Sequence, residues 1–183
     1  MTHAADPASV TGIILAGGQS RRMGQDKADI GYRGQTFLER AKALLYASGC
    51  NSVRVSGRPD LQGGLPDRQP GQGPAQAILD SLDAISGISS GALFIPVDMP
   101  LLEPDDLLPL MTNNPARACA WAGHPLPAYL PAGTILPAQA EIRSVKNLLA
   151  RFDTAWLEPH PEQIRRFSNI NSPEDLTSLP RSE

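Results

Sequence analysis

Short apolar runs and longer amphipathic stretches follow one another along the chain. Three runs are typical of strands: Thr11–Ala16, Ser52–Ser56 and Ala92–Val97. A stretch with apolar residues at helical spacing follows each run: Thr36–Ser48, Pro74–Ile85 and Pro104–Met111. Such an order predicts an α/β fold with a parallel sheet, in which ligands bind at the carboxyl ends of the strands.

The second half of the chain has weaker patterns. Residues 116–122 and 126–130 are predicted to be strands on either side of a His-Pro turn. A helical stripe follows around Val145 and Leu149, and Ser172-Pro173 is a typical helix start. We find no internal repeat and no linker. We therefore expect a single domain over residues 1–183, with residues 1–10 as a loose tail.

Composition excludes several classes of protein. The formal charge of −3 argues against a general nucleic-acid binder, and 5% aromatic residues are too few for a base-stacking platform. The apolar stretch from 118 to 140 is interrupted by several prolines, which argues against a membrane span. Two cysteines, Cys50 and Cys119, fit buried thiols better than a disulfide framework. No secretory signal is visible, so we expect a cytoplasmic protein.

The first predicted strand runs into a glycine-rich loop that also carries cations. The segment begins with Leu15-Ala16-Gly17-Gly18 and continues through Arg21 and Arg22 to Lys27. Adjacent glycines let a backbone approach a ligand closely, and three cations in one loop suit a polyphosphate. The loop matches neither a Walker motif nor a Rossmann fingerprint. The alternative is an ordinary loop with solvated charges.

Asp98 directly follows the third predicted strand. A carboxylate at that position faces the ligand crevice, and one carboxylate together with substrate phosphates is enough to hold Mg²⁺. The alternative is a turn or capping aspartate before Pro100. Asp105 and Asp106 are better explained by the helix dipole at the start of the next helix.

The glycine-rich loop also resembles the signature loop of a known family. Leu-Ala-Gly-Gly-x-Ser-x-Arg-Met-Gly-x-Asp-Lys is similar to that of the nucleotidyltransferases that make molybdenum cofactor dinucleotides, the molybdenum cofactor guanylyltransferases above all. Further similarities cover nearly the whole chain in the family's order: Gly73-Pro74, Pro96-Val-Asp98-Met-Pro100, His124-Pro125-Leu126 and Asn169-Ile-Asn171-Ser-Pro-Glu-Asp-Leu176. The resemblance implies a three-layer α/β/α sandwich of Rossmann-like type with a mostly parallel sheet.

The resemblance also implies an activity: transfer of GMP from GTP to the phosphate of molybdenum-bound molybdopterin, with release of pyrophosphate. It assigns GTP binding to the loop residues Leu15, Ala16, Gly17, Gly18 and Lys27, and Mg²⁺ to Asp98. Arg22, Lys27 and Asp98 are then the catalytic candidates, because they would neutralise the leaving pyrophosphate. Transient contacts with molybdoenzymes or their chaperones are a further implication.

Base recognition is assigned by the same resemblance to Asp67. Guanine presents neighbouring N–H donors that one carboxylate accepts as a fork. The alternative is a solvated loop aspartate. Gly17, where cytidylyl relatives carry alanine, leaves room for a larger base. For the second substrate the candidates are His124, Asn169 and Asn171, although a turn role explains His124 and Asn171 as well.

Two departures from the family pattern keep other functions open. Family members often have an Asn at the end of the second strand, where this chain reads Val55-Ser56-Gly57-Arg58. The helix opener is usually Gly-Pro-x-x-Gly, and here Ala77 takes the place of the last glycine. The alternatives are a related transferase that uses CTP or a sugar phosphate, and a non-catalytic module that binds nucleotide or pterin.

Overall fold

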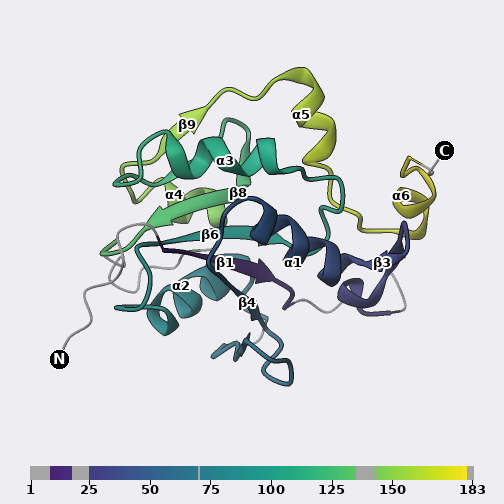
Figure 1. Cartoon of the computed structure of the whole chain (residues 1–183), viewed down its shortest axis with the longest axis horizontal. Coiled ribbons are helices and arrows are strands. Elements are labelled where there is room, and N and C mark those ends of the chain that lie inside the picture. The colour runs from purple at the N-terminus through teal and green to yellow at the C-terminus, as the bar shows by residue number, and fades with distance from the viewer. Residues whose placement is uncertain (1–8, 18–24, 70, 135–141, 143, 181–183) are drawn as a thin grey trace.

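A seven-stranded, mostly parallel sheet forms the middle of the molecule (Figure 1). The computed structural model describes residues 9–17, 25–69, 71–134, 142 and 144–180, and the contacts below refer to these. The strands stand in the order β5-β4-β1-β6-β8-β7-β9. Their bounds are Gly64–Leu65 (β5), Ser52–Ser56 (β4), Val10–Leu15 (β1), Gly91–Pro96 (β6), His124–Pro131 (β8), Cys119–Trp121 (β7) and Ala155–Leu157 (β9). β8 alone runs antiparallel to both of its neighbours, β6 and β7.

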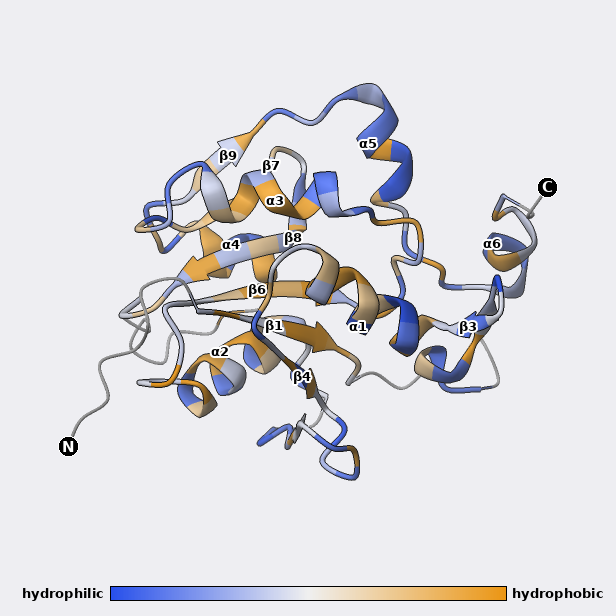
Figure 2. Cartoon of the chain, in the orientation of Figure 1, coloured by the Kyte–Doolittle hydropathy of each residue, from blue (hydrophilic) through white to orange (hydrophobic). Residues whose placement is uncertain are grey.

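Helices cover both faces of this sheet and give the predicted three layers (Figure 1). α1 (Phe37–Ala47) and α3 (Pro104–Thr112) bury their apolar sides on one face. α2 (Pro74–Ala84) and α4 (Val145–Leu149) cover the other. Colouring by hydropathy shows the central strands and the sheet-facing sides of the helices as the most apolar parts (Figure 2). The predicted fold class is confirmed.

Local chemistry explains where the main helices begin. Thr36 caps α1 by accepting a hydrogen bond from the Glu39 backbone N–H at 3.1 Å, and the Glu39 carboxylate accepts one from the Thr36 N–H at 2.7 Å. The hydrogen bonds that the Glu39 carboxylate accepts from the backbone N–H and the hydroxyl of Thr36 lower its pKa, because they favour its charged form. Pro74 occupies the first position of α2, where its missing N–H costs nothing. Pro96 is the last residue of β6, where the lack of an N–H does not interrupt the ladder.

Several elements differ from the sequence-based expectations. The predicted His-Pro turn is wrong: β7 and β8 are joined at Ala122-Gly123, and His124 already begins β8. Gly123 has a φ of +79°, which favours glycine in that turn. At the N-terminus, Val10 starts β1, so it belongs to the sheet and not to a tail, and the Ser9 carbonyl accepts a hydrogen bond from Ser90 N–H.

Two parts of the chain contain elements that the sequence did not predict. In the weakly patterned C-terminal third they are β9 and α5 (Pro161–Arg166), and near the N-terminus they are the hairpin strands β2 (Gly31–Tyr32) and β3 (Gln35–Thr36). α6 (Pro173–Thr177) begins at the predicted Ser172-Pro173. It lies beside β3 in Figure 1, and the Tyr32 hydroxyl donates to the Pro180 carbonyl at 2.8 Å. The C-terminal segment therefore crosses the carboxyl edge of the sheet.

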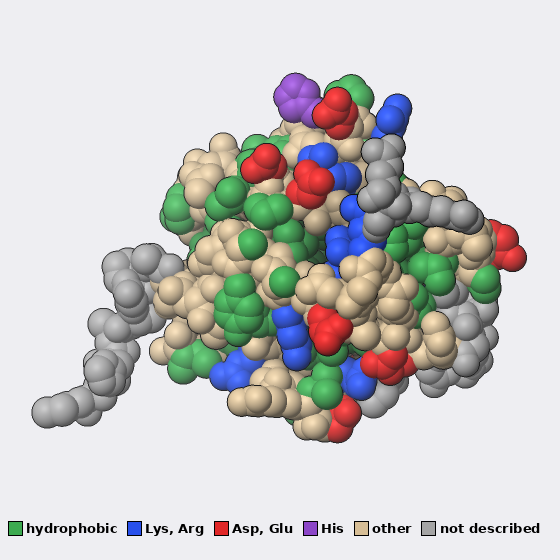
Figure 3. Space-filling model, turned by 45° about the vertical axis from the view of Figure 1, so that its right-hand side comes forward, with side chains coloured by type: hydrophobic (Ala, Val, Ile, Leu, Met, Phe, Trp, Pro, Cys, Tyr) green, Lys and Arg blue, Asp and Glu red, His purple; other side chains and the backbone are tan. Residues whose placement is uncertain are grey.

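Both cysteines are buried free thiols, as predicted. Burial raises the pKa of Cys50 to about 12, so this thiol stays protonated at neutral pH. On the face shown in Figure 3, acidic and basic side chains of the described residues are interspersed rather than gathered by sign. No described helix has the length and apolar character needed to cross a bilayer.

Candidate active site

The carboxyl ends of β4, β1 and β6 lie side by side and carry most of the predicted site residues. Backbone hydrogen bonds fix their positions: Ala16 N–H donates to Ser56 O at 3.1 Å, and Val97 N–H donates to Leu15 O at 3.2 Å. Asp98 therefore follows β6 at the same edge where Gly17 follows β1. β8 is antiparallel to β6, so His124 at its start lies at this edge too.

Gly17 and Gly57 make a close backbone contact at the ends of β1 and β4. A Cβ added at Gly57 would lie 2.5 Å from Gly17 Cα and 2.7 Å from Gly17 N, and Gly57 has a φ of +82°. Only glycine satisfies both demands. Gly57 thus allows the close approach of the backbones at the ends of β4 and β1.

We expect Gly57→Ala to destabilise the fold and to weaken nucleotide binding. The substitution strains a left-handed backbone and displaces Gly17 as well. Gly87→Ala is the matched control, because Gly87 has a φ of +77° with open space around it. The control should lose about 1–2 kcal/mol of stability and keep its KM for nucleotide. Denaturant unfolding and KM measurements check this; equal KM values for the two variants would contradict the role given to Gly57.

Asp67 lies beside Gly17. A Cβ added at Gly17 would come within 3.6 Å of Asp67 Oδ2. The other carboxylate oxygen of Asp67 accepts a hydrogen bond from Gln69 N–H at 3.2 Å, which orients the side chain. The next backbone N–H, that of Arg68, donates to Asp80 Oδ2 on α2 and ties the loop to the helix. Asp67, the predicted base-recognition residue, thus lies next to Gly17 in the predicted nucleotide-binding loop.

Lys27, Asp98, Asn169 and Asn171 form one cluster. Lys27 Nζ donates to Asp98 Oδ2 at 2.6 Å and to Asn171 Oδ1 at 2.6 Å, while Asn169 Nδ2 donates to Asp98 Oδ1 at 3.1 Å. The Lys27 and Asp98 side chains are 17% and 13% exposed. Residues from three distant parts of the sequence thus place a cation and a carboxylate at the sheet edge, where a ligand can reach both.

Asn171 is held in this cluster by the cap of α6. Asp175 Oδ2 accepts hydrogen bonds from the backbone N–H groups of Asn171 at 2.8 Å and Ser172 at 2.9 Å. The hydrogen bond from Asn171 is the main cause of a lowered pKa of Asp175. At a pH above the ordinary pKa of an aspartate, this lowered pKa stabilises the folded state. The stabilisation is lost as the pH falls through the lowered pKa of Asp175.

Arg58 is a residue of this edge that sequence reasoning missed. Its Nη1 donates to Asp26 Oδ2 at 2.9 Å, and the other oxygen of Asp26 caps the short 3₁₀ helix η1 (Lys27–Asp29) by accepting from Ala28 N–H. Arg58 therefore ties the segment after β4 to the segment that presents Lys27. The only sequence signal was an arginine directly after a strand-end glycine.

His124, at the start of β8, lines a cavity of about 380 Å³. Lys146, Phe167 and Asn169 line it as well. The rings of His124 and Phe167 are 5.0 Å apart. Pro96 and Met99, close to Asp98 in sequence, also line the cavity, and Asn169 contacts Asp98, so the cavity adjoins the cluster.

The remaining sequence predictions are placed as follows. Leu15 and Ala16 end β1 and lead into Gly17, while Gly18 and Arg22 lie outside the described residues. Ala77 is buried in the hydrophobic core cluster on the face of the sheet that α2 covers. Among the described residues no group of three or more His, Cys, Asp or Glu side chains is placed to hold a metal ion.

The donor set nevertheless fits a divalent cation held together with a substrate. Asp98 supplies hard carboxylate oxygens, and phosphates and water complete such sites when a single carboxylate is present. Its two oxygens face Lys27 and Asn169, groups that also suit phosphate oxygens. Asp98 is thus the described residue that would hold such a cation.

Comparison with known proteins identifies the fold and its class. The model of the "MobA-like NTP transferase domain" matches residues 12–160. A molybdenum cofactor guanylyltransferase of Xanthomonas euvesicatoria is 34% identical over 92% of this chain and 93% of its own length. One of Rhodobacter capsulatus is 33% identical over 91% of this chain and 93% of its own.

A solved structure agrees with this fold. The molybdopterin-guanine dinucleotide biosynthesis protein A of Archaeoglobus fulgidus superposes with a TM-score of 0.62 over 91% of this chain and 95% of its own, at 21% identity. The residues that the MobA-like domain model matches include Gly17, Lys27, Asp67 and Asp98. The chain belongs to the MobA-like NTP transferases and is a nucleotidyltransferase.

Proposed function

We propose that the protein transfers GMP from GTP to the terminal phosphate of molybdenum-bound molybdopterin, with Mg²⁺ as its metal. The observation that carries this is the order of features along the sheet edge. Gly57, Gly17 and Asp67 lie at β4 and β1, the Lys27–Asp98 pair at β1 and β6, and the His124 cavity at β8. A nucleotide and a second phosphate compound bound at the two ends would meet at Lys27 and Asp98.

The chemistry needs little from a protein base. A phosphate monoester has a second pKa near about 6, so the nucleophile is already ionised at pH 7. One of its oxygens attacks the α-phosphorus of GTP, the bond to the bridging oxygen breaks, and pyrophosphate leaves with the electron pair. The bound cation would neutralise phosphate charge during this transfer. Lys27 would bind the charge that grows on the leaving group, and Asn171 would orient Lys27.

The two substrates would be selected on opposite sides of the Lys27–Asp98 pair, the nucleotide near Asp67 and the molybdopterin at the cavity beside His124. Asp67 would accept hydrogen bonds from guanine N1–H and N2–H, because a carboxylate matches this pair of donors. His124, Phe167 and Asn169 would contact the molybdopterin from the cavity at β8. Arg22 keeps its predicted catalytic role as part of this proposal. Contacts with molybdoenzymes or their chaperones stay a prediction, which no described contact supports.

We expect Gly17→Ala to weaken the use of GTP more than the use of CTP. The added methyl contacts Gly57 Cα at 3.4 Å and Asp67 Oδ2 at 3.6 Å, so the fold tolerates it and the larger base loses its space. The ratio of kcat/KM for GTP over CTP should fall about tenfold. Gly31→Ala, which meets nothing within 4 Å, is the control. Equal losses for the two nucleotides would mean that position 17 serves the phosphates.

The experiment that tests the proposal is a comparison of nucleotides in a turnover assay. Purified protein, Mg²⁺ and molybdenum-bound molybdopterin are supplied with GTP, CTP or ATP, and released pyrophosphate is measured. Preference for GTP that Asp67→Asn abolishes supports the assignment. Preference for CTP, or turnover only with a sugar phosphate, would favour a related transferase. Nucleotide binding without turnover would favour a binding module.

A further inference from the structure

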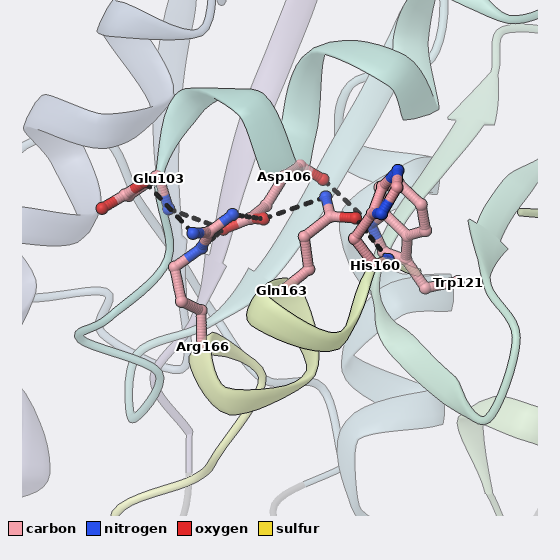
Figure 4. A network of polar contacts seen from close by, with 6 residues as sticks. All are labelled: Glu103, Asp106, Trp121, His160, Gln163 and Arg166. Carbon is pink, nitrogen blue, oxygen red and sulfur yellow. Dashed lines mark hydrogen bonds and ion pairs between the residues drawn. The ribbon is translucent and has the colours of Figure 1, made fainter. Parts of the chain in front are cut away.

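A buried ion pair lies behind the candidate site, between α3 and α5 (Figure 4). Arg166 donates to both carboxylate oxygens of Asp106, from Nε at 2.8 Å and from Nη2 at 2.7 Å. The Asp106 side chain is fully buried, whereas the Arg166 side chain is 22% exposed. Gln163 Nε2 adds a hydrogen bond at 3.2 Å, and Trp121 Nε1 donates to the Asp106 carbonyl at 2.9 Å. The helix dipole, which explains Asp106 from sequence, thus accounts for only part of its environment.

This pair joins two of the three chain segments that build the Lys27–Asp98 cluster, and Lys27 lies on the third. One segment runs from Asp98 at the end of β6 to Asp106 in the first turn of α3. The other, here called the crossing segment, is residues 166–171. The two are joined a second time at the site, where Ile170 N–H donates to Asp98 O at 2.8 Å and Asn169 Nδ2 donates to Asp98 Oδ1.

The crossing segment is thus fixed at both ends over a short length of chain. Between them Phe167 is 4% exposed and packs on Trp121 at 5.9 Å and on His124 at 5.0 Å between ring centroids. Bidentate arginine–carboxylate pairs fix direction as well as distance, because both hydrogen bonds are satisfied in one orientation only. Arg166 thus anchors one end of the crossing segment and the cap of α6 anchors the other, so a change at Arg166 would loosen the stretch that carries Asn169 and Asn171.

We infer that Arg166 and Asp106 are positioning residues for the transfer reaction, which set the register of the crossing segment so that Asn169 and Asn171 hold Asp98 and Lys27 in reactive geometry. The inference rests on the proposed function for its kinetic consequence only. Small displacements at a reacting centre are costly, on the order of a hundredfold in rate per ångström in unfavourable cases. The guanine side at Gly17 and Asp67 lies on other strands and stays unaffected.

The kinetic test uses two variants. One carries the single change Arg166→Met, and the other carries both Asp106→Asn and Arg166→Met, which leaves no buried charge unpaired. We expect kcat to fall about 10- to 100-fold, with the KM for GTP unchanged and with partial rescue in Arg166→Lys. Arg117→Met is the control, because Arg117 forms a similar pair with Asp153 at 2.6 Å on the surface. It should keep the parent kcat. An unchanged kcat in both Arg166 variants would overturn the inference.

A double-mutant comparison separates positioning from general destabilisation. In a protein that already carries Asn169→Ala and Asn171→Ala, the Arg166→Met change should lower kcat no further, because its effect passes through these two side chains. An equal further fall would show that Arg166 acts otherwise and would overturn the inference.

Hydrogen exchange gives a readout that does not depend on turnover. The Ile170 amide should exchange at least about tenfold faster in either Arg166 variant than in the parent, while amides of β1 keep their protection. Unchanged exchange at Ile170 would overturn the inference. If the parent protein does not transfer GMP, the proposed function fails, and the exchange result alone decides whether the pair sets this segment.

Discussion

Asp98→Asn should lower turnover by at least about 10²–10³-fold and leave the protein folded. The change removes the charge that would hold the cation and that now binds Lys27 at 2.6 Å. The amide keeps the size of the side chain, and the backbone carbonyl of residue 98 still accepts from Ile170 N–H. Kinetics across a Mg²⁺ titration, with unfolding curves alongside, measure both expectations.

Asp105→Asn provides the matched control for that change. Asp105 is an exposed carboxylate in the first turn of α3, close in sequence but outside the cluster with Lys27. Its neutralisation should leave turnover at the parent level. Full activity of Asp98→Asn at limiting Mg²⁺ would contradict the assignment of the metal to Asp98.

Lys27→Ala should lower kcat about 10²–10³-fold while the KM for GTP changes little. The charge on the bridging oxygen grows as its bond to the α-phosphorus breaks, so a fixed cation there binds the transition state better than the ground state. Asn171 Oδ1 at 2.6 Å and Asp98 Oδ2 at 2.6 Å fix the ammonium in place. Lys27→Arg should rescue only partly, because a planar guanidinium does not replace a compact ammonium.

Steady-state kinetics with pyrophosphate detection at two Mg²⁺ concentrations distinguish this role from simple charge neutralisation. If Lys27 only neutralised the overall charge of the triphosphate, added Mg²⁺ would restore the activity of Lys27→Ala. The substitution would then raise KM and leave kcat unchanged. That result would remove Lys27 from the reacting centre and leave it as part of the nucleotide-binding surface.

Local sequence signals predicted the framework well. The capping residues Thr36 and Glu39 specify the start of α1 through contacts three residues apart, and Pro96 marks a strand exit because it lacks an N–H. Asp98 could be placed at the site for the same reason: its position depends only on the strand that precedes it. Patterns of this kind are contained within a few residues.

Contacts between distant residues could not be derived in that way. Lys27 meets Asn171 across 144 positions, and Arg166 meets Asp106 across 60, so neither pair has a local signature. The family resemblance indicated the second-substrate side for Asn169 and Asn171, and the structure places them directly on Asp98 and Lys27. Gly57 meets Gly17 from a neighbouring strand, so this close contact has no local signature either. The antiparallel direction of β8 against β6 is a further contact between distant residues.

The most direct test of the account follows the α-phosphate of GTP. The protein is incubated with Mg²⁺, molybdenum-bound molybdopterin and GTP labelled at the α-phosphorus, and the products are separated and counted. The account predicts that the label appears in a pterin guanine dinucleotide, with one pyrophosphate released for each dinucleotide formed. Label that stays in GTP, or that is found only in free GMP, would contradict it.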